Sequence, residues 1–159
     1  MFLGSVIYKQ NHRMVYNDFP FPESLKKNSA DAPLLYLFLF FKKSDCPSCL
    51  VEMVEVLNSL PSQFCPAGIP VGEEDEQLRD EQELRRLTNI SFPLYSSKEF
   101  KRYLPWRTPT LFGITPAGKI LFVLPGIPGH TFNLENMLIS IYGKLYPSHG
   151  SGRENIGGV

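Results

Sequence analysis

The sequence predicts a three-layer α/β/α domain with a mixed central sheet. Three observations carry this prediction. A continuous apolar run at 33–41 is typical of a central strand that is buried on both faces. A helical repeat of apolar residues and a second short strand follow it, which is the order of a parallel strand–helix–strand unit. Two later strands are joined by a tight turn and therefore predict an antiparallel hairpin.

The length and composition allow one well-buried core. The chain has 159 residues, of which 43% are hydrophobic and 13% aromatic, enough for one domain and too few for two ordinary ones. Sixteen basic and sixteen acidic side chains cancel, so no global field favours nucleic acid or an anionic membrane surface. The longest apolar run is about half of the roughly 20 residues that a membrane-spanning helix needs. We therefore expect no nucleic-acid partner and no membrane-spanning segment in this chain.

Three parts of the chain differ in character. Residues 1–32 are expected to form an N-terminal extension with two short strands, at 6–8 and 14–16. This extension lacks the basic start and sustained apolar run of a secretory signal, which export would in any case remove. Residues 33–146 form the domain itself. Residues 147–159 are rich in glycine and serine, and we expect them to be disordered.

In the first half of the domain, residue spacing predicts two helices around a strand. Apolar residues recur at helical spacing over 50–60 until Pro61 ends the pattern. A second short strand is expected at 67–71. The acidic stretch 73–83, whose charge is expected to be mostly solvated, leads into a helix that carries three leucines on one side: Leu78, Leu84 and Leu87.

The second half contains the hairpin between two further helices. A short helix is expected at 98–104 and a strand at 111–114. The turn residues of 115–118 connect it to an antiparallel strand at 119–124. A last helix is expected at 134–145, and no internal repeat is visible.

The residues that carry chemistry are Cys46 and Cys49, a C-x-x-C pair at the junction of strand and helix. A cysteine in the first turn of a helix is stabilised as thiolate by unpaired backbone N–H groups and by the helix dipole. Cys49, one turn further, can attack the Cys46 sulfur and resolve a mixed disulfide. Pro47 suits the start of a helix because its missing N–H would be unpaired there.

Other interpretations of this pair stay open. The same spacing forms half of a zinc site, but the remaining candidate ligands are scattered singly: Cys65, His12, His130 and His149. Two unreactive buried cysteines are a second alternative, since free cysteine is often part of a core. Cys65 has no partner at a suitable spacing, and we interpret it as structural.

The order of these motifs resembles the thioredoxin superfamily, and within it the TlpA/ResA-like thiol:disulfide oxidoreductases of the AhpC/TSA group. The resemblance covers about residues 33–146 and rests on the apolar strand, the Cys-Pro-Ser-Cys motif with its helix, the Arg-Thr-Pro-Thr segment at 107–110 and the turn at 115–120. It implies a thioredoxin-like fold and exchange of disulfides with a protein substrate and a redox partner protein. It implies no metal and no organic cofactor, and an extracytoplasmic setting.

The resemblance also implies a substrate site. Pro109 would follow a cis peptide bond and face the dithiol, and Thr108 would offer its backbone to the extended substrate chain. Pro47 and Ser48, inside the dithiol motif, would contact the substrate. Trp106, beside this loop, can present a flat surface to a partner protein or can be a packing residue.

An acidic residue three positions after the second cysteine recurs in the TlpA/ResA-like branch, and Glu52 occupies that place. It shares a helix face with Cys49, so its carboxylate can accept and return the Cys49 proton, or it can be a solvated glutamate. Two departures narrow the resemblance. Residues 43–45 lack the tryptophan that usually precedes the dithiol, and residues 39–41 lack the buried strand acid of thioredoxin itself.

Two rival functions remain. The first is a peroxidase of the same superfamily, in which one cysteine attacks peroxide. The second is a non-catalytic metal carrier or interaction domain that keeps the fold, with His130 as an additional ligand.

Overall fold

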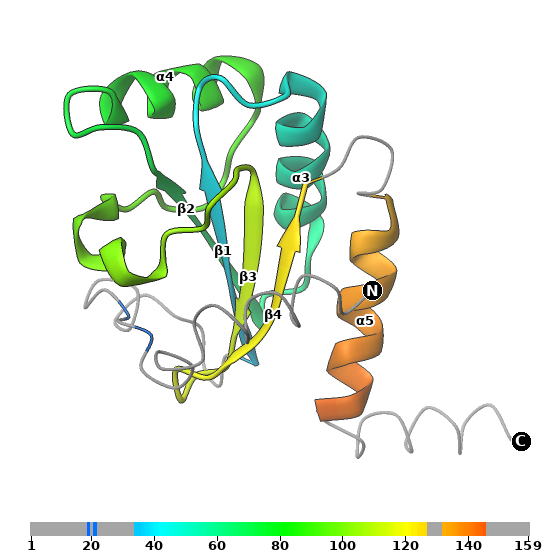
Figure 1. The fold of residues 1–159 in the computed structure, drawn as a ribbon. Coiled ribbons are helices and arrows are strands. Elements are labelled where there is room, and N and C mark those ends of the chain that lie inside the picture. Colours follow the sequence, from blue (N-terminus) through cyan, green and yellow to red (C-terminus); the bar gives the residue numbers. More distant parts are fainter. Residues whose placement is uncertain (1–18, 20, 22–33, 127–131, 146–159) are drawn as a thin grey trace, which may run out of the picture.

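The structure is a computed structural model that describes residues 19, 21, 34–126 and 132–145 (Figure 1). The two strands expected at 6–8 and 14–16, the tail at 147–159 and all three histidines lie outside the described residues. Along the chain the elements are β1 (Leu35–Phe41), α3 (Pro47–Ser59), β2 (Phe64–Pro70), α4 (Gln77–Leu87), the 3-10 helix η2 (Ser97–Tyr103), β3 (Thr110–Ile114), β4 (Ile120–Pro125) and α5 (Phe132–Leu145).

The four strands form one mixed sheet in the order β2-β1-β3-β4. Strand β1 pairs in parallel with β2 and antiparallel with β3, so that Phe38 lies between Ala67 and Phe112. Strands β3 and β4 form the antiparallel hairpin. The predicted strand–helix–strand unit and the predicted hairpin are both confirmed, and β1 is the central strand that joins them.

Every residue of β1 is buried, and successive side chains enter two different cores. Leu37 and Leu39 pack on the face covered by α3, α4 and α5. Phe38 and Phe40 pack on the opposite face, which η2 and Phe19 cover. This arrangement explains why the run at 33–41 shows no alternation of apolar and polar residues, and it confirms a sheet covered on both faces.

The parallel pairing places the dithiol at one end of the molecule. Cys46 and Cys49 follow the carboxyl end of β1, whereas Cys65 is the second residue of β2 and pairs with Tyr36 near the start of β1. Cys65 is half-buried and packs against the core that contains Phe38. The third cysteine therefore lies at the opposite end of the strands from the dithiol.

One detail of α4 contradicts the sequence-based expectation, and one residue of the acidic stretch is an exception to it. Leu78 is 62% exposed, whereas Leu84 is fully buried; six residues along a helix amount to a rotation of about 240°, so the two side chains point to different sides. Asp80, in the acidic stretch expected to be mostly solvated, is only 1% exposed. In addition, the helix expected at 98–104 is the 3-10 helix η2. No helix among the described residues has the length and apolar character needed to cross a membrane.

Candidate active site

The two cysteines of the C-x-x-C motif occupy different places at the start of α3. Cys46 is the N-cap residue, and its sulfur accepts a hydrogen bond from the backbone N–H of Cys49 at 3.4 Å. Pro47 takes the first helical position, where its missing N–H leaves no bond unmade. Cys46 is partly exposed and Cys49 is buried, and neither forms a disulfide in this structure. One cysteine of the pair is thus accessible to solvent and the other is not.

The surroundings of the two thiols shift their pKa values in opposite directions. The pKa of Cys46 lies below its ordinary value because its sulfur accepts hydrogen bonds from the Cys49 thiol, the Ser48 hydroxyl at 3.2 Å and the Cys49 backbone. Burial raises the pKa of Cys49 to about 11, and the neighbouring charges of Cys46 and Glu52 add to the rise. This pair therefore combines one thiol that loses its proton more readily than an ordinary cysteine with one that keeps its proton at neutral pH.

Glu52 lies in the same helix, one turn after Cys49, and is half-buried. Its carboxylate is close enough for its charge to raise the pKa of Cys49. The structure therefore places Glu52 on the helical turn after Cys49, near enough for its charge to act on that thiol.

The segment before β3 forms the second wall of the site. The peptide bond between Thr108 and Pro109 is cis, as the resemblance implies. The hydroxyl of Thr110 donates a 2.7 Å hydrogen bond to the Arg107 carbonyl, which closes the turn. At the end of β4, the N–H of Gly126 donates a 2.8 Å hydrogen bond to the Pro109 carbonyl. Pro109 is buried and Thr108 half-buried, so this segment, the cis-proline loop (107–110), is held from both sides.

Asp45 connects the dithiol to the cis-proline loop, a role that the sequence analysis missed. Its Oδ1 atom accepts a 2.7 Å hydrogen bond from the Thr108 hydroxyl, and its Oδ2 atom accepts one of 2.7 Å from the backbone N–H of Lys42. Burial raises the pKa of Asp45; the hydrogen bonds from Thr108 and Lys42 and the Lys42 charge oppose that rise, and the charge of Asp80 adds to it. Cys46 is the next residue in the chain.

Asp80, also missed, supports the same region from α4. Its two carboxylate oxygens accept backbone hydrogen bonds from Lys43 at 2.9 Å and from Gly72 at 3.1 Å. Lys43 belongs to the loop between β1 and the dithiol, and Gly72 follows β2. The buried carboxylate thereby joins two loops at the dithiol end of the sheet. Nothing in the composition of the acidic stretch distinguishes Asp80 from its solvated neighbours.

The remaining predicted site residues are exposed. Pro47 and Ser48 are exposed in the first turn of α3. Trp106 is 72% exposed, with the guanidinium carbon of Arg107 5.6 Å from its ring centre. Trp106 is therefore not a packing residue, and it stands two residues before Thr108.

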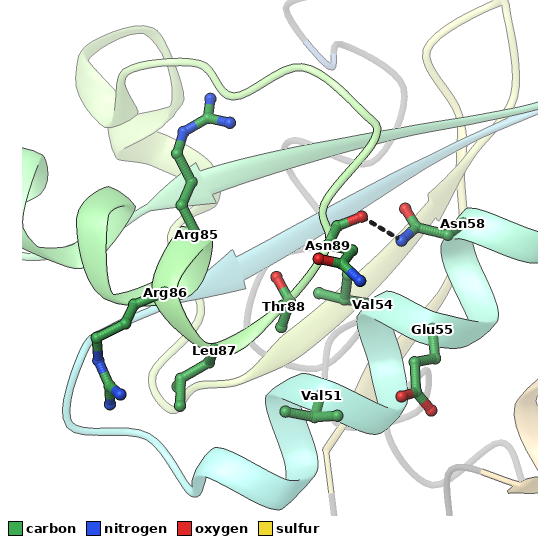
Figure 2. A pocket seen from close by; sticks show the side chains of 9 residues that line it. All are labelled: Val51, Val54, Glu55, Asn58, Arg85, Arg86, Leu87, Thr88 and Asn89. Carbon is green, nitrogen blue, oxygen red and sulfur yellow. Dashed lines mark hydrogen bonds between the residues drawn. The ribbon is translucent and has the colours of Figure 1, made fainter.

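A concave feature lies away from the two cysteines. A groove of about 340 Å³ lies between α3 and the end of α4. Figure 2 shows the side chains that line it, which are Val51, Val54, Glu55 and Asn58 of α3 and residues 85–89. The Asn58 amide donates a 2.8 Å hydrogen bond to the Asn89 carbonyl. No cysteine lines the groove. Within the described part of the chain, no group of three or more His, Cys, Asp and Glu side chains is placed to hold a metal ion.

Comparison with known proteins identifies the fold. No protein-family model matches the chain, and no curated protein sequence matches it. Among solved structures, it is similar to a thiol-disulfide isomerase from Corynebacterium glutamicum, with a TM-score of 0.53 and 16% identity over 79% of this chain and 88% of that one.

Two further structures are similar to the chain. StoA from Bacillus subtilis aligns with a TM-score of 0.52 and 18% identity over 67% of this chain and 83% of that one. A secreted disulfide oxidoreductase of Mycobacterium tuberculosis, described as homologous to E. coli DsbE, aligns with a TM-score of 0.50 and 17% identity over 68% of this chain and 82% of that one. The chain has a thioredoxin-like fold.

Proposed function

We propose that this chain is a protein thiol:disulfide oxidoreductase that works through Cys46 and Cys49. The observation that carries the proposal is the unequal pair of thiols at one helix start. Cys46 is partly exposed with a lowered pKa, and Cys49 is buried with its pKa raised to about 11. An attacking thiol needs thiolate character and access, and a resolving thiol needs reach and a later deprotonation.

In the reducing direction, the Cys46 thiolate attacks one sulfur of a substrate disulfide. A mixed disulfide forms and the other substrate sulfur leaves as a thiolate. Cys49 then loses its proton and attacks the Cys46 sulfur, which releases the second substrate thiolate and leaves a Cys46–Cys49 disulfide. Two electrons pass from the dithiol to the substrate. The oxidising direction is the reverse, and a redox partner protein restores the starting state.

Glu52 is proposed to take the Cys49 proton during the second step. A thiol whose pKa is about 11 carries almost no thiolate at neutral pH, so its attack needs a base nearby. Glu52 is the acid whose charge already acts on Cys49, and a positioned carboxylate within reach can serve as a general base.

The substrate is proposed to be an extended protein segment that lies along the cis-proline loop. Thr108 offers its backbone, Pro109 closes the loop beside the dithiol, and exposed Trp106 contacts the partner. The exposed Pro47 and Ser48 complete the surface around Cys46.

We further propose an extracytoplasmic setting, exported or periplasmic. The similar Mycobacterium tuberculosis oxidoreductase is described as secreted, and the C-x-x-C pair and fold suit exchange with disulfides that persist in oxidising compartments.

Equilibration with glutathione buffers tests the proposed function. The purified protein is held at stepwise ratios of reduced to oxidised glutathione, quenched with an alkylating agent and analysed by mass spectrometry. A Cys46–Cys49 disulfide should form and disappear in a single two-electron transition, unchanged in the Cys65→Ser control. Two cysteines that stay alkylated separately at every ratio would refute the proposal, and peroxide turnover with sulfenic acid at one cysteine would favour a peroxidase instead.

A further inference from the structure

The hydrogen bond between Asp45 and Thr108 spans 63 residues of sequence and joins the two loops that flank the exposed sulfur. Asp45 directly precedes Cys46, and Thr108 directly precedes the cis proline. At 2.7 Å, with an ionised acceptor, this is a short charge-assisted bond of the stronger kind. It is therefore the direct link between the nucleophile and the loop proposed to bind the substrate chain.

The Asp45 side chain is also held in place by hydrogen bonds other than the one from Thr108. The other carboxylate oxygen accepts from the Lys42 backbone, and the Asp45 N–H donates to the Lys42 carbonyl at 3.1 Å. A tight turn over 42–45 thus orients the carboxylate. The buried Asp80 holds this turn in place through the Lys43 backbone N–H. Asp45 is aimed at Thr108 by bonds that do not depend on Thr108.

We propose that Asp45 is a positioning residue for disulfide exchange, which holds the Thr108 hydroxyl and so sets the cis-proline loop relative to Cys46. The inference rests on the proposed function, in which the substrate chain pairs with the Thr108 backbone. The Asp45–Thr108 hydrogen bond would then place that chain next to the Cys46 sulfur. Asp45 acts through Thr108 and does not itself react. A fixed loop binds an extended segment with less loss of conformational entropy than a loop that must be ordered on binding.

Steady-state reduction of a disulfide-bonded peptide, with glutathione as the regenerating thiol, tests this inference. Thr108→Val keeps the shape of the side chain and removes its hydroxyl. We expect it to raise the KM for the peptide about tenfold, the scale of a hydrogen bond to a charged group, with a much smaller change in kcat. Thr108→Ser restores the hydroxyl and should bring KM back to within about threefold of the wild-type value.

Thr88 provides a matched control. Its hydroxyl also donates a 2.7 Å hydrogen bond, to the Leu84 carbonyl at the end of α4, and it lines the groove away from the dithiol. Thr88→Val should leave the KM for the peptide unchanged. Alkylation of Cys46 should be equally fast in Thr108→Val and wild type, since none of the hydrogen bonds to the Cys46 sulfur comes from Thr108.

A double-mutant cycle with Asp45→Ala assigns the effect to the pair. Because Asp45→Ala already removes the partner of the Thr108 hydroxyl, adding Thr108→Val should raise KM no further. Additive effects in the double variant, or a wild-type KM in Thr108→Val, overturn the inference while the exchange activity stands. No turnover by the wild-type protein refutes the proposed function and this inference with it.

Discussion

Selective alkylation of the reduced protein tests whether Cys46 and Cys49 differ in reactivity as their pKa values and exposure predict. At neutral pH, Cys49, with its pKa raised from 9.0 to about 11, carries about a hundredfold less thiolate than an ordinary cysteine. A thiolate of higher pKa is intrinsically more nucleophilic, with a Brønsted coefficient of about 0.4–0.5. The Cys49 thiolate should therefore react roughly tenfold faster than the thiolate of an ordinary cysteine. Together, these two effects make the reaction rate of Cys49 about tenfold lower than that of an ordinary cysteine, before its burial is considered. Burial of Cys49, at 1% exposure, slows its reaction further.

We therefore expect Cys46 to react with iodoacetamide at least about tenfold faster than Cys49 at neutral pH. The assay is a time course in the Cys65→Ser background, with the modified cysteine located by peptide mass spectrometry. The Cys46 rate should level off at a lower pH than that of an ordinary cysteine, whereas the Cys49 rate should still rise as the pH approaches 11, because each thiolate fraction saturates only above its own pKa. Equal rates, or faster labelling of Cys49, would show that this account of the two thiols is wrong.

Three further substitutions test the supporting contacts. Ser48→Ala removes a hydrogen bond to the Cys46 sulfur and should raise the pKa of Cys46, measured by thiolate absorbance against pH; an unchanged or lower pKa contradicts the assignment. Asp80→Ala leaves two backbone N–H groups without their buried acceptor and should lower the free energy of unfolding by about 3 kcal/mol in urea denaturation, with Asp80→Asn intermediate; a loss below about 1 kcal/mol refutes the role. Gly126→Ala places a methyl 2.7 Å from the Pro109 ring and should destabilise the protein by about 1–3 kcal/mol, whereas wild-type stability would mean that the ring moves freely.

The sequence allowed most of the fold to be predicted because its strongest signals are local. The unbroken apolar run of β1, the helical spacing of α3 and the turn residues between β3 and β4 each determine their own element. The C-x-x-C motif likewise predicts the start of α3, because Pro47 suits the first position of a helix. Boundaries shifted by a few residues, as in β2, which begins at Phe64 where 67 was expected.

The rest of the site depends on contacts between distant segments. Asp45 and Thr108 are 63 positions apart, and Asp80 reaches Lys43 across 37. No local pattern marks an aspartate whose partners lie on another loop, so Asp80 could not be distinguished from the solvated acids around it. The same reason applies to Gly126, whose close approach to Pro109 exists only in the folded chain.

The most direct test of the central claim is to trap the mixed disulfide. Cys49→Ser and Cys46→Ser are each incubated, in the Cys65→Ser background, with a peptide that contains one disulfide, and the products are analysed by mass spectrometry under non-reducing conditions. Disulfide exchange through Cys46 predicts that Cys49→Ser accumulates a covalent Cys46–peptide adduct, because the resolving thiol is absent. Cys46→Ser should form almost none, since buried Cys49 is left alone. An adduct in Cys46→Ser only, or in neither variant, would contradict the account.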